Sequence, residues 1–156
     1  MTVRQLYQTD AKQIAEIETA CFADPWSVDS ICSAMENKNN AFFGVFSQNR
    51  LIGYGGVSVV AGEGYVLNIG VLPEHRTKGA GRMLLESIIQ HCQKQRAAFL
   101  SLEVRVSNAP ARGLYENSGF MPAGLRRGFY QNPKEDALIL TKYFSGGDRN
   151  DEYIGD

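Results

Sequence analysis

Asn68-Ile-Gly-Val-Leu-Pro-Glu-His-Arg-Thr-Lys-Gly-Ala-Gly-Arg-Met-Leu-Leu85 is the most informative stretch of this 156-residue chain. An apolar strand ends at Pro73, and a polar loop then leads to a helix that begins near Gly79 and Gly81. Glycines let backbone N–H groups face a ligand, and a helix N-terminus carries partial positive charge. Arg76, Lys78 and Arg82 add cations. The stretch therefore predicts an anion site that suits a diphosphate.

The motif does not fit the two common nucleotide-binding loops. A P-loop has Lys and then Ser or Thr after its second glycine, whereas Arg82 and Met83 follow Gly81 here. A dinucleotide fingerprint has a third glycine three residues further on, where Leu84 stands. A glycine pair by itself is also compatible with a plain loop that starts a helix, so the spacing alone leaves that interpretation open.

Hydropathy patterning on both sides of this stretch predicts one mixed α/β domain over residues 1–144. Thr9 or Asp10 is an expected N-cap of the first helix, Ser27 is that of the second, and Gly119 is an expected C-cap. Three glycines weaken the strand 51–60 and predict close approach of a neighbouring element: Gly53, Gly55 and Gly56. The expected elements are strand 3–7, helices from 10 and from 27, strands 41–46, 51–60 and 65–71, a helix to about 96, strand 99–104, helix 110–117, and strands from 120 and over 136–143.

Composition places the chain among ordinary globular proteins. Apolar residues make up 44% and charged residues 21%, and the formal net charge is −1. No apolar run is long enough for a membrane span, and the N-terminus lacks a secretory pattern, so we expect a cytoplasmic protein without membrane contact.

The charge is unevenly distributed. Residues 145–156 carry a net charge of −3 and little apolar content, so we expect a disordered acidic tail. The body without this tail has a net charge of +2. A mildly basic body suits a small anionic ligand and gives little support to direct nucleic-acid binding.

Cysteine and histidine do not indicate a reactive or metal site. Cys21, Cys32 and Cys92 are widely spaced and lie in helical patterns, which indicates reduced thiols that pack in helices. His75 and His91 lack further ligands at zinc-like spacing, so we expect no metal.

Several motifs in order resemble the GNAT N-acetyltransferases, and more narrowly the RimI-type ribosomal-protein alanine N-acetyltransferases. The first is Arg76-x-x-Gly79-x-Gly81 after Ile69-Gly70-Val71, which is similar to that family's acetyl-CoA motif. The resemblance covers roughly residues 3–144 and implies a GNAT fold, with a central mixed, twisted sheet of six to seven strands and helices on both faces. The other matching segments are Asn108 to Phe120, Phe22, Pro25-Trp26-Ser27, Leu102 to Arg105 and Arg126 to Tyr130.

The resemblance also implies a role for each matching residue. Backbone groups of Ile69, Gly70 and Val71 would bind the pantetheine arm of acetyl-CoA, and Asn108 would contact the coenzyme near its thiol. Glu103 would be the general base, and Tyr115 the general acid. The expected pyrophosphate-binding residues are Arg76, Thr77, Lys78, Gly79, Ala80, Gly81 and Arg82.

Acetyl transfer to an amine requires these residue types. A peptide α-amine has a pKa of about 7.7–8.0 and is mostly charged at neutral pH, so a carboxylate such as Glu103 is needed to accept its proton. The alternative for Glu103 is an ion pair with Arg105 or another arginine. The phenol of Tyr115 can protonate a leaving thiolate, and its alternative is plain aromatic packing. We expect a backbone N–H near Val71 to stabilise the oxyanion.

The acceptor side is less well defined. Trp26 and Tyr130 are candidates for the walls of a substrate groove, and each is equally compatible with core packing. Arg126 and Arg127 fit either acceptor binding or a solvated surface.

The predicted function is acetyl transfer from acetyl-CoA to the N-terminal alanine of the eighteenth small-subunit ribosomal protein, by direct attack in a ternary complex. Alternatives are a GNAT enzyme with another acceptor, such as other protein N-termini, lysine or a small amine, and a non-catalytic acyl-CoA-binding regulator. A ribosome- or nucleic-acid-binding module is the remaining rival, and the mild charge of the body argues against it.

Overall fold

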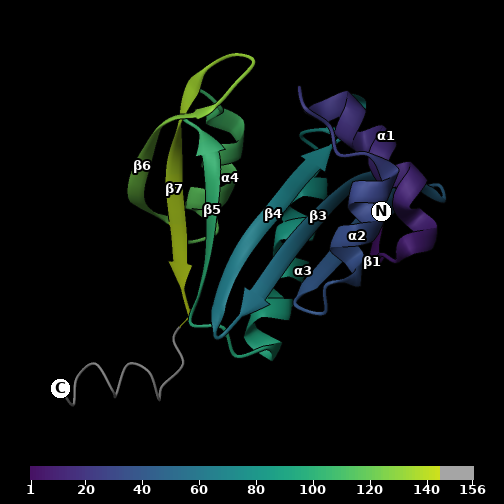
Figure 1. The fold of residues 1–156 in the computed structure, drawn as a ribbon, viewed down its shortest axis with the longest axis horizontal. Helices are drawn as coiled ribbons and strands as arrows, with labels where there is room; N and C mark the ends of the chain where they lie inside the picture. The colour runs from purple at the N-terminus through teal and green to yellow at the C-terminus, as the bar shows by residue number, and fades with distance from the viewer. Residues whose placement is uncertain (145–156) are drawn as a thin grey trace. The chain divides into compact units, whose positions relative to one another are not determined.

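The computed structural model describes residues 1–144, and the acidic tail predicted at 145–156 lies outside the described residues. Helices and strands alternate in the mixed order that the sequence predicts (Figure 1). The helices are α1 (Ala11–Cys21), α2 (Val28–Glu36), α3 (Ala80–Lys94) and α4 (Ala109–Asn117), with short 3-10 helices η1 (Gln8–Asp10) and η2 (Pro73–His75). The strands are β1 (Thr2–Gln5), β2 (Asn40–Ser47), β3 (Arg50–Val60), β4 (Glu63–Val71), β5 (Phe99–Arg105), β6 (Met121–Tyr130) and β7 (Glu135–Tyr143).

Within residues 1–144, seven strands form one hydrogen-bonded sheet in the order β1-β2-β3-β4-β5-β7-β6. The pairs β1–β2, β2–β3, β5–β7 and β6–β7 are antiparallel, whereas the start of β4 pairs in parallel with the start of β5. The predicted mixed α/β sheet is therefore confirmed.

The chain divides into two compact units. Unit 1 comprises residues 1–58 and 66–91, and unit 2 comprises residues 59–65 and the chain from residue 92 onward. Unit 1 holds β1, β2, most of β3 and β4, α1, α2 and most of α3, while unit 2 holds the end of β3, the start of β4, β5 to β7 and α4. That the two units make one domain over 1–144 stays a prediction.

In unit 1, helices cover both faces of the strands. Tyr54 points its side chain toward α1, and the alternate positions Gly53 and Gly55 face α3, which lies behind β3 in Figure 1. A Cβ on Gly55 would lie 2.9 Å from Ile88, and one on Gly53 would lie 3.3 Å from Leu84. The predicted close approach is therefore confirmed, with α3 as the approaching element at these two glycines and the Phe42 ring of β2, 2.7 Å from an added Cβ, at Gly56.

Local signals set most of the helix ends. The Ser27 hydroxyl accepts from the backbone N–H of Ser30 at 3.1 Å and caps α2, as the sequence predicts. Gly119 follows α4 with φ +93°, as expected for a C-cap glycine. Asp10 precedes α1, but its carboxylate binds Arg4 and the Tyr7 backbone and makes no cap hydrogen bond to α1.

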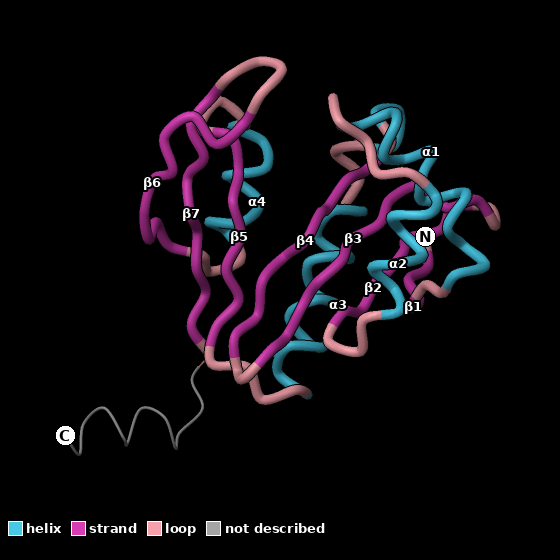
Figure 2. The backbone as a smooth tube through the Cα atoms, viewed as in Figure 1, coloured by secondary structure: helices cyan, strands magenta, loops and turns pink. Residues whose placement is uncertain are grey.

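In unit 2, strand alternation places the catalytic candidate. Leu100, Leu102 and Val104 are buried on one side of β5, as predicted. On the other side, Ser101 is buried and hydrogen-bonded to Thr141 on the neighbouring strand, while Glu103 is only partly buried. Figure 2 shows β5 beside β7, the strand that pairs with it along its whole length.

Candidate active site

The predicted phosphate loop joins β4 to α3 in unit 1. Thr77 and Gly79 adopt positive φ values of 64° and 94°, and a Cβ on Gly79 would meet no atom within 4 Å. The first backbone N–H of α3 that donates to a carbonyl four residues earlier is that of Met83, which lies 3.1 Å from the Gly79 oxygen. The earlier amides of the first turn therefore have no helical acceptor. Lys78 and Arg82 are exposed beside them, so the loop fits a diphosphate.

Arg76 has a different role from that of the other loop cations. Its Nε donates to the Val71 carbonyl at 2.9 Å, and its Nη2 lies 3.6 Å from the Cys21 sulfur. The side chain therefore braces the end of β4 against α1. Burial raises the pKa of the Cys21 thiol, which suits a packing residue better than a nucleophile.

Glu103 lies on β5 in unit 2 with 31% of its side chain exposed. Its Oε2 lies 3.6 Å from Nε of Arg126 on β6, whose side chain is 57% exposed. The ion-pair alternative is therefore present, with Arg126 as the partner in place of Arg105. A solvated pair of this kind is weak, so it leaves the carboxylate accessible to another partner.

Tyr115 lies on α4 and is 4% exposed, with its ring 5.8 Å from that of Phe120. Burial raises the pKa of its phenol well above the ordinary value, and nearby Tyr130 adds to the shift. The hydroxyl therefore stays protonated at neutral pH, which a general acid requires. The ring contact with Phe120 bears out aromatic packing, and it leaves the hydroxyl available for the predicted role of general acid.

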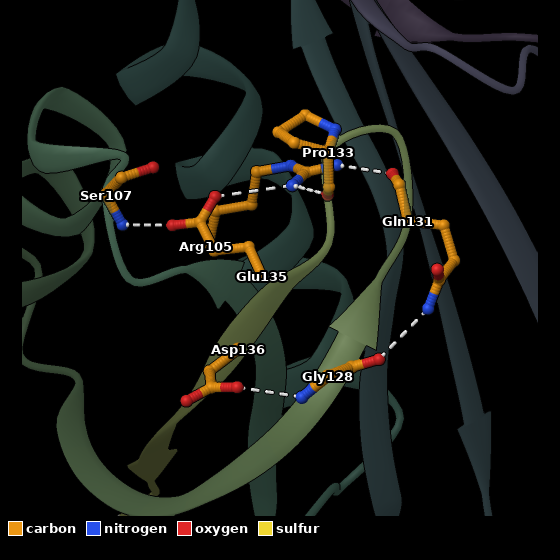
Figure 3. A network of polar contacts seen from close by, with 7 residues as sticks. All are labelled: Arg105, Ser107, Gly128, Gln131, Pro133, Glu135 and Asp136. Carbon is orange, nitrogen blue, oxygen red and sulfur yellow. Dashed lines mark hydrogen bonds and ion pairs between the residues drawn. The ribbon is translucent and has the colours of Figure 1, made fainter.

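Tyr130 ends β6 and lies against Arg105, which is the centre of the polar network drawn in Figure 3. The Arg105 guanidinium lies 4.5 Å from the centre of the Tyr130 ring and donates to the carbonyls of Gln131 and Pro133 at 3.0 and 2.9 Å. Burial, and then the charge of Glu103, raises the pKa of Tyr130 to about 12. Tyr130 therefore lies within the electrostatic reach of the candidate base.

Glu135 completes this network. It pairs with Arg105 at 3.3 Å and accepts from the Ser107 backbone N–H at 2.7 Å. Hydrogen bonds from Ser107, and then from Arg105, hold the pKa of the Glu135 carboxyl below its usual range. The β6–β7 loop is thus tied to the end of β5.

Asn108 and Trp26 both have structural contacts. The Asn108 side-chain oxygen accepts from the Ala111 backbone N–H at 3.3 Å and caps α4, so a coenzyme contact would fall to its amide nitrogen. Trp26 is half-buried and packs against the core of unit 1, so the core-packing alternative holds for part of its ring. Arg126 and Arg127 are exposed on β6.

The segment that contains these candidate residues matches a known protein family. The family model described as "Acetyltransferase (GNAT) family" matches residues 5–120. The chain belongs to the GNAT acetyltransferase family. The matched segment includes the glycine loop, Glu103 and Tyr115.

Individual GNAT relatives cover nearly the whole chain. The ribosomal protein bS18-alanine N-acetyltransferase of Escherichia coli K12 is 36% identical over 142 residues, which are 90% of this chain and 95% of the relative. The N-alpha-acetyltransferase RimI of Mycobacterium tuberculosis is 32% identical over 148 residues, covering 91% and 92%. The crystal structure of the E. coli ribosomal-protein-S18-alanine N-acetyltransferase superposes with a TM-score of 0.85 at 35% identity, covering 92% and 94%.

Sequence reasoning gave no role to one buried carboxylate of this GNAT chain. Glu18 on α1 is fully buried and accepts hydrogen bonds from Trp26, Tyr54 and Asn68. The signal was its spacing, because Glu18 lies four residues after Ile14 on the apolar side of the helix. A carboxylate at such a position needs donors, which the sequence does not identify.

Among residues 1–144, no group of three or more metal-ligating side chains is placed to hold a metal ion. In the same described part of the chain, no helix is long and apolar enough to span a membrane.

Proposed function

We propose that this chain transfers the acetyl group of acetyl-CoA to the N-terminal alanine of ribosomal protein bS18, by direct attack in a ternary complex in the cytoplasm. The observation that carries the proposal is the 36% identity, over 90% of the chain, with an enzyme named for that reaction. The site residues support it, since a glycine loop, an accessible carboxylate and a protonated phenol are all present.

On the cofactor side, the backbone of the loop does most of the binding. Thr77 to Arg82 would hold the pyrophosphate with unpaired amides and two exposed cations. Backbone groups of Ile69, Gly70 and Val71 would bind the pantetheine arm, with Asn108 near the thiol. Acetyl-CoA supplies the activated thioester when it is bound.

On the acceptor side, side chains do the chemistry. Glu103 would take the proton of the α-amine, directly or through a water, because a charged amine has no lone pair for attack. Tyr115 would protonate the leaving thiolate, and a backbone N–H near Val71 would stabilise the oxyanion. Trp26 and Tyr130 would border the acceptor peptide.

The test is incubation with acetyl-CoA and three synthetic peptides, followed by mass spectrometry that locates any added acetyl group. The first peptide starts with a free alanine, the second has the same sequence with a blocked α-amine, and the third has a blocked α-amine and an added lysine. We expect acetylation of the first peptide only.

The other outcomes separate the rival functions. Modification of the third peptide would identify a lysine acetyltransferase and overturn the proposal. Binding of acetyl-CoA by calorimetry without transfer to any of the three would indicate a non-catalytic acyl-CoA-binding protein.

A further inference from the structure

Helix α1 buries a carboxylate among apolar side chains of unit 1. Glu18 is 0% exposed, as is Ile14, and Ile17 is 1% exposed on the same side of the helix. A buried ionised carboxylate is strongly unfavourable unless hydrogen-bond donors surround it. The catalytic roles proposed above leave Glu18 unused, so its burial requires another explanation.

Three donors from three different segments converge on Glu18. Its Oε1 accepts from the backbone N–H of Trp26 at 2.8 Å. Its Oε2 accepts from the Tyr54 hydroxyl on β3 at 2.5 Å and from the Asn68 amide nitrogen on β4 at 2.9 Å. Burial, and then the bond to Glu18, raises the pKa of Tyr54 far above its ordinary value, so the phenol remains a donor.

Two of these segments are the ones to which acceptor and cofactor binding are assigned. Trp26 belongs to the connector between α1 and α2 (residues 22–27), and Asn68 immediately precedes the pantetheine-binding segment of β4. The connector touches that segment again, because a Cβ on Gly70 would lie 3.3 Å from the ring of Phe22. Glu18 is therefore the shared acceptor between the connector and β4.

We propose that Glu18 is a positioning residue for the acceptor: it fixes the connector, and with it Trp26, against β4 through one buried carboxylate. This inference rests on the function proposed above, since it assigns Trp26 to the acceptor groove. The hydrogen bond from the Trp26 backbone N–H fixes the main chain of the connector directly. A connector held only through its side chains would keep more conformational freedom, because those side chains could change rotamer. Removing the acceptor releases the Trp26 amide, and the connector then loses its fixed position.

The test compares Glu18→Met, which removes both acceptor oxygens, with Glu18→Gln, which keeps one oxygen for the Trp26 amide. Ile14→Ala is the matched control, because it opens a cavity on the same face of α1 without touching the network. We expect Glu18→Met to raise the KM for the alanine peptide tenfold or more and to change the Kd of acetyl-CoA less than threefold. Glu18→Gln should stay within threefold of wild type in both.

Fluorescence gives a second readout that needs no activity. Trp26 is the single tryptophan of the chain, so its emission reports on the connector. In Glu18→Met, folded by circular dichroism, we expect a red-shifted emission and stronger quenching by acrylamide. Ile14→Ala should lower the melting temperature and leave both the emission and the peptide KM unchanged.

Failure of this proposal is distinguishable from failure of the proposed function. If no peptide is acetylated, the fluorescence comparison still decides whether Glu18 positions Trp26. Wild-type peptide KM and wild-type emission in a folded Glu18→Met protein would overturn the positioning role. If Glu18→Met does not fold, Glu18→Leu, another apolar side chain without acceptor oxygens, provides the same readouts: a raised peptide KM with a red-shifted emission supports the role, and no change in either overturns it.

Discussion

The two units each contain a glutamate bound into a polar network, and the two networks differ in their access to water. Glu18 in unit 1 is fully buried and saturated by three donors. Glu103 in unit 2 is about one third exposed and has one guanidinium at 3.6 Å. A fully buried carboxylate offers no surface that a substrate amine can approach, whereas a carboxylate that is one third exposed does. Burial thus separates the glutamate that we propose as a positioning residue from the one that we propose as the base.

We expect the largest effect on kcat from Glu103→Gln. The amide cannot accept a proton, so kcat should fall by about 10²–10⁴ while the Kd of acetyl-CoA is unchanged. The deficit should be greatest near pH 7 and shrink above about pH 8, where the α-amine loses its proton unaided. A pH–rate profile from 6 to 9 measures this.

Glu116→Gln is the control for that variant, since Glu116 is an exposed glutamate on α4. It should retain wild-type rates. A Glu103→Gln enzyme that matches the wild type across this pH range would remove Glu103 from the mechanism and leave only its ion pair with Arg126.

The next effect in size concerns Tyr115→Phe. The ring and its contact with Phe120 remain, so the melting temperature should change little. Loss of the hydroxyl should lower kcat roughly tenfold to a hundredfold, the low end of what a positioned proton donor contributes. Tyr65→Phe, which removes an exposed hydroxyl bonded to Glu63, is the matched control. Unchanged turnover in Tyr115→Phe would assign this tyrosine to packing alone.

A smaller effect is expected for Arg105→Lys. Lysine keeps the charge but cannot bond Gln131, Pro133 and Glu135 together, because only the planar guanidinium offers several donors in fixed directions. We expect a peptide KM raised about threefold to tenfold, since the loop next to Tyr130 loosens, and a melting temperature lowered by about 2–6 °C. Steady-state kinetics with thermal unfolding measures both. A lowered melting temperature with an unchanged KM would separate this network from acceptor binding.

The smallest effect on stability should come from Arg126→Gln. An exposed ion pair contributes roughly 0–1 kcal/mol, so the free energy of unfolding in urea should change by less than about 0.5 kcal/mol. A loss above about 2 kcal/mol would show that Glu103 is held as firmly as Glu18 and would remove the contrast between the two carboxylates. Arg127→Gln, the neighbouring exposed arginine, is the control.

Much of the fold could be predicted because its signals are local. The caps at Ser27 and Gly119 and the alternation of Leu100, Leu102 and Val104 depend on a few neighbouring residues, and the structure confirms them. One positive φ value of the β4–α3 loop was predictable for the same reason, since it falls on Gly79, whereas the positive φ of Thr77 has no such local signal. Asp10 shows the limit of such signals, because its carboxylate binds Arg4 and the Tyr7 amide in preference to the amides of α1.

The sequence by itself determined the family, the order of elements, and the residue types that could bind a diphosphate and move a proton. Only the tertiary structure decided which carboxylate is buried and which is solvated, and that Arg76 braces the end of β4. It also showed that Glu103 pairs with Arg126, whereas Arg105 pairs with Glu135. The physical reason is that burial and donor geometry come from chain segments far apart in the sequence, such as Glu18, Trp26, Tyr54 and Asn68, whose contacts form only when the strands and helices pack together.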